Sequence, residues 1–247
     1  MRLASLALCL LSAIPAYAEQ VNVAAASDLN FAIKEIIQHF EGETGHNVRL
    51  TLGSSGNFYA QIVNGAPFDV FLSADVDYPR QLEKAGRAES GSIFIYGIGG
   101  IALWVRKTSS LRPDQAGMKT LLEPSVRKIA IANPEHAPYG RAAVAAMQKA
   151  NVYDSVKSKL VLGENISQAA QFVQSGAADI GIIGLSIAMS EPMQRTGVYW
   201  VIPRDTYPRL EQGAVLLKRG GPGAKAFLDW LKSEPARMIL QKYGFGL

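Results

Sequence analysis

Short polar turns stand where runs of strand-forming residues give way to helical patterns, and these turns have the residue types that bind small anions. They are Ser27-Asp28, Ser54-Ser55-Gly56, Ser73-Ala74-Asp75 and Asn165-Ile166-Ser167. The first N–H groups of a helix have no partner within the helix, and together with the helix dipole they attract anions. Serine hydroxyls add donors without adding charge. Several such turns on one sheet edge predict an anion site, although helix capping explains each turn taken singly.

The sequence lacks the residue combinations of an enzyme. His39 lies in a helical pattern and His46 beside a turn, which is typical of solvated or structural histidines, so a nucleophilic serine has few candidate bases. Residues 53–56 read Gly-Ser-Ser-Gly and do not form a G-x-S-x-G elbow, and the aspartates between 69 and 77 lack calcium-loop spacing. We therefore expect a binding protein with no catalytic residues and no metal site. An exported hydrolase that uses Ser55 is the less favoured alternative.

Three strand–turn–helix units position the turns in the first part of the chain. Strand-like patterns occupy residues 21–25, 48–52 and 69–72, and apolar residues recur at helical spacing over 29–40, over 58–63 and up to about residue 86. Successive units of this kind form parallel strands in a sheet with helices on both faces. The turns that follow those strands then lie at one edge of the sheet.

The second half of the chain repeats this alternation. It begins after a long apolar segment, residues 93–105, whose glycines suit a crossing between two lobes. Strand patterns at 128–132, near 161 and at 179–183 alternate with helical patterns at 140–150 and 166–173. Two more extended runs, 199–203 and 213–217, precede a helix at 224–231. The sequence therefore predicts two similar α/β halves joined by extended segments.

The N-terminus differs from the rest of the chain. Of the 247 residues, 48% are hydrophobic and 19% are charged, and the net charge of +4 is scattered, so nucleic-acid binding is not indicated. Arg2, the apolar run 3–14 and the small-residue motif 16–18 predict a secretory signal peptide over residues 1–18, cleaved near Ala18. Its removal also removes Cys9, the single cysteine. We expect an exported, soluble product.

Five segments of the chain resemble, in the same order, the periplasmic molybdate-binding proteins of ABC transporters. They are AASDL at 25–29, GSSG continuing to AQIVNGAP at 53–67, FLSAD at 71–75, NPEHAPYG at 133–140 and KYGF at 242–245. The resemblance extends over essentially the whole chain after residue 18, which makes it far more specific than any single motif.

The resemblance implies a two-lobed, type II periplasmic binding protein fold. Each α/β lobe has a mixed, mainly parallel sheet flanked by helices, and the ligand lies in the interlobe cleft. We expect residues 19–99 and 208–247 to form lobe I and residues 100–207 to form lobe II. The implied function is to capture molybdate, and tungstate as well, in the periplasm and to deliver it to an ABC permease. The protein is then a monomer without a cofactor. The alternative is the same fold with another small oxyanion, phosphate or sulfate.

The resemblance also implies which residues hold the ligand. The matching positions are Ser27 and Ser55 for hydroxyl donors, Asp28 and Ile166 for backbone N–H donors, and Tyr139 in the second lobe. Some members place a further tyrosine hydroxyl near the position of Gly184, which has none, so we expect Tyr139 to supply the phenol.

Asp28 departs from the family pattern, because many relatives have a neutral side chain there and a carboxylate repels a dianion. The favoured interpretation is that the Asp28 side chain turns away and caps the following helix, while its N–H meets the ligand. The alternative is that the carboxylate accepts a proton from a protonated oxyanion such as hydrogen phosphate. Molybdate, tungstate and sulfate have no such proton.

Overall fold

The computed structural model describes residues 18–246. The predicted signal peptide therefore lies outside the described residues except for Ala18, and it stays a prediction. Within the described part of the chain, each helix is too short or too polar to cross a membrane.

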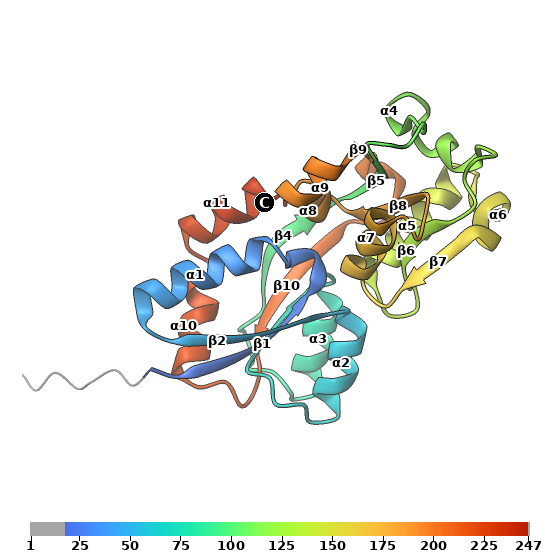
Figure 1. Ribbon diagram of the computed structural model, residues 1–247. Helices are drawn as coiled ribbons and strands as arrows, with labels where there is room; N and C mark the ends of the chain where they lie inside the picture. Colours follow the sequence, from blue (N-terminus) through green and yellow to red (C-terminus); the bar gives the residue numbers. More distant parts are fainter. Residues whose placement is uncertain (1–17, 247) are drawn as a thin grey trace, which may run out of the picture.

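The first sheet contains five strands in the order β2-β1-β3-β10-β4 (Figure 1). Their bounds are Gln20–Ala26 (β1), Asn47–Gly53 (β2), Val70–Ser73 (β3), Phe94–Gly99 (β4) and Leu210–Leu216 (β10). β1 pairs in parallel with β2 and β3, whereas β10 is antiparallel to both β3 and β4. The sheet is therefore mixed, as predicted, because the last strand returns to it from the other half of the molecule.

Helices cover both faces of the first sheet. They are α1 (Ala32–Thr44), α2 (Ser55–Val63), α3 (Asp77–Lys84), α10 (Pro222–Trp230) and α11 (Glu234–Lys242). Val23 of β1 is buried in one cluster with Ile33 and Phe227, whereas the next residue, Ala24, is buried in another with Phe58. This alternation follows from the period of two in a strand. These elements together form the first lobe.

The second sheet also has five strands, in the order β7-β6-β8-β5-β9. Their bounds are Ile101–Arg106 (β5), Ile129–Ala132 (β6), Leu160–Gly163 (β7), Ile180–Gly184 (β8) and Gly197–Val201 (β9). β6 is parallel to β7 and β8, and β5 is antiparallel to β8 and β9. The helices are α4 (Pro113–Ala116), α5 (Pro138–Lys149), α6 (Tyr153–Val156), α7 (Ile166–Ser175), α8 (Leu185–Ala188) and α9 (Glu191–Thr196). These elements form the second lobe.

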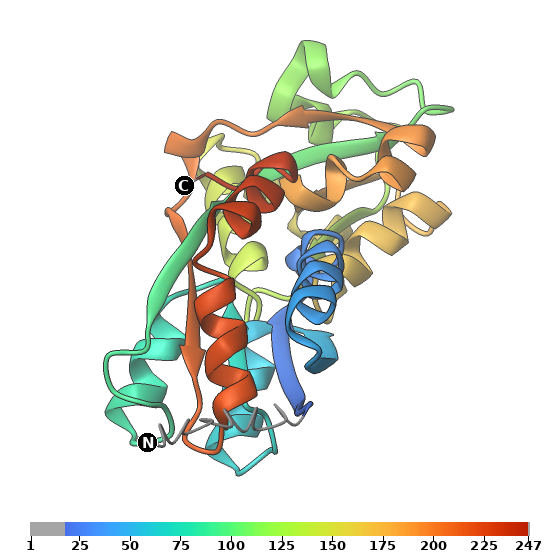
Figure 2. The same ribbon diagram turned by 90° about the vertical axis from the view of Figure 1, so that its left-hand side faces the viewer.

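The chain crosses between the lobes twice. The first crossing runs from β4 through Gly100 into β5, and it is seen as the long green strand in Figure 2. The second leads from β9 through residues 202–209 into β10. The glycine-punctuated segment 93–105 thus forms two strands of different sheets. The lobe boundaries at 99/100 and 207/208 stay a prediction.

The two sheets turn comparable edges toward each other. In the first lobe β1, β2 and β3 are parallel, so the turns after Ala26, Gly53 and Ser73 lie at one edge. In the second lobe the same holds for β6, β7 and β8, which lead to α5, α7 and α8. The polar turns of the sequence therefore meet between the lobes. Ligands of open α/β sheets bind outside such strand ends.

Candidate functional site

The five residues predicted to bind a ligand are all buried where the lobes meet. Their exposed fractions are 3% for Ser27, 1% for Asp28, 1% for Ser55, 2% for Tyr139 and 3% for Ile166. Ser27 and Asp28 follow β1 in a 3-10 turn (Ser27–Leu29), and Ser55 begins α2. Tyr139 lies in the first turn of α5, and Ile166 begins α7. The first three belong to the first lobe and the last two to the second.

Asp28 and Tyr139 form a direct hydrogen bond between the lobes. The Tyr139 hydroxyl donates to Asp28 Oδ2 over 2.8 Å. The amide nitrogen of Gln212, on β10, donates to the same carboxylate oxygen over 2.7 Å and to the Tyr139 hydroxyl over 2.9 Å. The other oxygen, Asp28 Oδ1, is buried and has no hydrogen-bond partner in the described part of the chain. We call Asp28, Tyr139 and Gln212 the carboxyl cluster.

The expectation that Asp28 caps a helix with its side chain is wrong. Neither the 3-10 turn nor α1, which begins after Phe31, has a side-chain cap. The carboxylate instead bonds to residues 111 and 184 positions away along the chain. Capping preference is local, and here tertiary partners from α5 and β10 decide the orientation of the side chain.

The carboxyl cluster shifts the acidity of its members. Burial raises the pKa of Asp28 from 3.8 to about 6, although the hydrogen bonds from Gln212 and Tyr139 oppose the rise. Burial, reinforced by the charge of Asp28, raises the pKa of Tyr139 well above 10. The same two causes raise the pKa of Tyr96, whose hydroxyl donates to the side-chain amide oxygen of Gln212, Oε1, over 2.8 Å. Both phenols therefore stay protonated at physiological pH.

Ser27 joins the first lobe to the start of α7. Its hydroxyl donates to Asn165 Oδ1 over 3.1 Å and accepts from the Ser167 N–H over 3.3 Å. The Ser167 hydroxyl donates to the Ser27 carbonyl over 2.9 Å. Asn165 caps α7 by accepting from the Gln168 N–H. Ile166, between these polar residues, has the backbone position of a first-turn donor.

Ser55 lies in a separate contact beside the second lobe. Its hydroxyl accepts from the Ala74 N–H, just after β3, over 2.9 Å. The residues around it reach the second lobe, because the Ser54 hydroxyl and the Gly56 N–H both donate to the His136 carbonyl, over 2.6 and 3.0 Å. A Cβ on Gly56 would lie 2.6 Å from that carbonyl, so only glycine permits this approach.

Sequence reasoning missed Gln212, Tyr96 and Ser186 as members of the interlobe contact. Ser186, at the start of α8, donates its hydroxyl to the Asp28 carbonyl over 2.7 Å. Gln212 could have been singled out as an amide side chain in a largely apolar strand. It is fully buried there, and a buried amide requires hydrogen-bond partners. The register shift between Gln212 and Gly213 marks the same place. Gly184 lies beside Tyr139, as expected: a Cβ there would be 3.5 Å from the ring.

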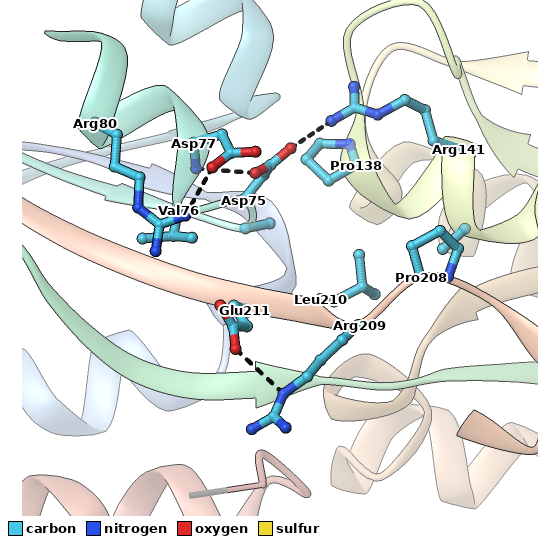
Figure 3. A pocket seen from close by; sticks show the side chains of 12 residues that line it. Asp75, Val76, Asp77, Arg80, Pro138, Arg141, Pro208, Arg209, Leu210 and Glu211 are labelled. Atoms are coloured by element: carbon cyan, nitrogen blue, oxygen red, sulfur yellow. Dashed lines mark hydrogen bonds and ion pairs between the residues drawn. The ribbon is translucent and has the colours of Figure 1, made fainter. Parts of the chain in front are cut away.

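A cavity of about 300 Å³ lies between the lobes (Figure 3), and its lining includes Pro138 and Glu211, the chain neighbours of Tyr139 and Gln212. It is lined from both lobes: Ala74, Asp75, Val76, Asp77, Arg80, Leu210 and Glu211 from the first, and Pro138, Arg141 and Ala142 from the second, together with Pro208 and Arg209. Figure 3 shows Arg141 of α5 pointing at Asp75, and their ion pair measures 2.7 Å. Charged residues thus surround this cavity in pairs, outside the buried contact.

The buried contact itself is built from neutral donors. Among the described residues, the buried polar set contains serines, Thr120, Gln212 and two aspartates, Asp28 and Asp69, and neither Lys nor Arg. Within the same residues, no group of three or more His, Cys, Asp or Glu side chains could hold a metal ion. Hydroxyls, an amide and helix-start N–H groups suit an anion that is held without ion pairs. Fold and site together define a two-lobed solute-binding protein.

Comparison with known proteins identifies the family. Residues 21–246 match the bacterial extracellular solute-binding protein family. Molybdate-binding protein ModA of Rhodobacter capsulatus is 42% identical over 243 residues, which cover 98% of this chain and 94% of the relative. ModA of Azotobacter vinelandii is 41% identical over 239 residues, covering 96% and 94%. The chain therefore belongs to the bacterial extracellular solute-binding proteins, together with these relatives.

The solved structures agree with this assignment. The periplasmic molybdate-binding protein of Azotobacter vinelandii superposes with a TM-score of 0.85 at 35% identity, covering 92% of this chain and 99% of that one. The predictions of a two-lobed periplasmic binding protein fold and of a solute-binding protein rather than an enzyme are confirmed.

Proposed function

We propose that this chain captures molybdate, and tungstate as well, and delivers it to an ABC permease. The observation that carries the proposal is the burial of Ser27, Asp28, Ser55, Tyr139 and Ile166 between two lobes. Two relatives more than 40% identical over nearly their full length are molybdate-binding proteins, which supports the same ligand. The oxyanion is cargo, so the proposal includes no resident cofactor.

Recognition in this proposal uses fixed dipoles. The first lobe provides the N–H groups at the start of α2 and the hydroxyls of Ser27 and Ser55. The second lobe provides the N–H groups at the start of α7. Binding would replace the present contact of Ser27 with Asn165 and Ser167 by bonds to the oxyanion. Release then breaks neutral hydrogen bonds and no ion pair, and closure of hinged lobes excludes water from the ligand. Selection against sulfate rests on cavity size, because charge and donor requirements are alike.

Localisation and assembly are part of the same proposal. The predicted signal peptide, cleaved near Ala18, directs the chain to the periplasm, where it acts as a monomer. Membership in the extracellular solute-binding family supports the export.

Titration calorimetry with sodium molybdate, tungstate, sulfate and phosphate tests the ligand. The expected result is tight binding of molybdate and tungstate and weak or absent binding of the other two. Binding of phosphate alone, lost in Asp28→Asn, would overturn the proposal in favour of an ionised Asp28 that accepts a proton from the ligand. Ester hydrolysis that disappears in Ser55→Ala would overturn it in favour of an enzyme.

A further inference from the structure

Asp28 brings a carboxyl group into a site that the proposed function assigns to a doubly negative oxyanion. The side chain is 1% exposed, and both of its side-chain donors, the Tyr139 hydroxyl and the Gln212 amide, bond to Oδ2. Oδ1 is buried without a partner in the described residues. A buried carboxylate oxygen that accepts no bond is costly. The same oxygen carrying a proton becomes a hydrogen-bond donor without an acceptor, which is what an oxyanion supplies.

The groups around Asp28 donate hydrogen bonds to its carboxylate, including the backbone N–H groups of Asp28 and Leu29, but no cation pairs with it in the described part of the chain. From α5 it faces the Tyr139 hydroxyl, from β10 the Gln212 amide, and from α8 the Ser186 hydroxyl, which bonds to its carbonyl. Tyr96 of β4 lies one step further, bonded to Gln212. On the side of α7, the adjacent Ser27 forms hydrogen bonds to Asn165 and Ser167, both neutral.

The titratable groups around Asp28 also stay neutral. They are Tyr139 and Tyr96, and burial raises the pKa of each well above 10. Arg141, two residues beyond Tyr139 on α5, directs its guanidinium to Asp75 at the cavity of Figure 3. A dianion placed beside an ionised Asp28 would therefore meet an unscreened like charge in a buried setting.

We propose that Asp28 enters the ligand complex as a neutral carboxylic acid whose Oδ1–H is a hydrogen-bond donor to the oxyanion, so that capture of each dianion takes up one proton. This inference rests on the proposed function. The proton comes from the solvent buffer, goes to the Asp28 carboxylate, and returns to solvent when the ligand leaves. A carboxylic acid kept neutral by an apolar site is a known way to place a donor opposite an oxyanion.

A proton that is bound together with the ligand makes the affinity depend on pH. In the free protein the Asp28 carboxyl, whose pKa is raised to about 6, is mostly ionised at neutral pH. Above about pH 7, each rise of one pH unit lowers the fraction of the protein whose Asp28 carboxyl is protonated and can bind the dianion. The apparent Kd therefore rises about tenfold per unit. Below about pH 5 the carboxyl is already protonated and the dependence disappears.

Calorimetry of the mature wild-type protein with sodium molybdate tests this inference without any variant. At about pH 8, titrations in two buffers of different ionisation enthalpy should give close to one proton taken up per molybdate. Proton uptake near zero, with a Kd that stays constant from about pH 6 to pH 8, would overturn the inference and leave the proposed function standing. Absence of molybdate binding both at about pH 6 and at about pH 8 would overturn this inference and the proposed function together.

The Asp28→Asn variant provides a second arm. An asparagine amide keeps a donor at this place and carries no titratable proton, so the Kd of this variant should be independent of pH, with no proton uptake. Asp69→Asn is the matched control. Asp69 is buried at the opposite end of the first sheet, where it accepts from Asn22, and its variant should keep the wild-type dependence on pH. A pH dependence that survives in Asp28→Asn would assign the proton to another group and overturn the inference.

Discussion

Asp28 and Asp75 are the same residue type in comparable places, yet their surroundings give them opposite properties. Each follows a strand of the first sheet, β1 or β3, at the edge that faces the second lobe, and each bonds to a side chain of α5. Asp28 accepts from the Tyr139 hydroxyl over 2.8 Å, and Asp75 pairs with the Arg141 guanidinium over 2.7 Å. The partners are two residues apart on one helix.

Burial and the charge of the partner account for the difference. The Asp75 side chain is 28% exposed and faces a cation, so its charge is both solvated and paired. Asp28 is 1% exposed and faces a phenol and an amide. Helix α5 thus takes part in two kinds of interlobe contact: a partly exposed ion pair, and a buried contact without a cation that depends on the proton of one carboxyl.

The largest expected effect concerns stability and pH. Because the pKa of Asp28 is about 6 in the folded chain and 3.8 as its ordinary value, the folded state holds an extra proton between these pH values. The contribution of Asp28 to the free energy of unfolding is therefore greatest below pH 3.8, and it falls by about 3 kcal/mol as the pH rises through 6. Denaturant unfolding of the ligand-free protein at about pH 4 and pH 7.5 measures this loss.

The Asp28→Asn variant should lack this decrease, whereas Asp75→Asn should keep it. If both variants retained the wild-type profile, the contrast between the two aspartates would be wrong in its main point.

Ser55→Ala should have the next largest effect, on affinity. Loss of a hydrogen bond to a charged ligand weakens binding by roughly 1.5–3 kcal/mol, measured by calorimetry with molybdate. Ser190→Ala is the matched control, because Ser190 is equally buried but bonds to the Ile187 carbonyl within the second lobe. An unchanged affinity in Ser55→Ala would remove this residue from the site.

Tyr139→Phe should weaken molybdate binding less than Ser55→Ala does, by about 1 kcal/mol, because the phenol hydrogen is donated to Asp28. It should also raise the pKa of Asp28 further, since one of the bonds that lower it is lost. Carbon-13 NMR of the carboxyl group measures that pKa. A loss of affinity as large as that of Ser55→Ala would make the phenol a direct ligand.

The smallest effect is expected for Arg141→Gln. An exposed ion pair contributes about 0.2–1 kcal/mol and is screened by salt, so the affinity for molybdate should fall only slightly, and the difference from wild type should vanish at high ionic strength. Calorimetry at low and high salt measures both. A large loss that persists in salt would place Arg141 in the binding contact itself and remove the distinction between the two aspartates.

Local patterns in the sequence carry much of the fold. The polar turns at Ser27, Ser55 and Ile166 were predictable, because strand and helix periods change there and the parallel strands bring such turns to one edge. The orientation of the Asp28 side chain was not predictable. It depends on Tyr139 and Gln212, which lie 111 and 184 residues away, and no local preference carries that information.

Gly99 has a mechanical consequence. It is the last residue of β4 before the chain changes lobes, and a side chain there would collide with the Tyr139 hydroxyl and the Gln212 amide. The segment that crosses between the lobes and two members of the carboxyl cluster are therefore packed directly against each other. A larger residue at position 99 would displace Tyr139 and Gln212 and distort the crossing segment at the same time.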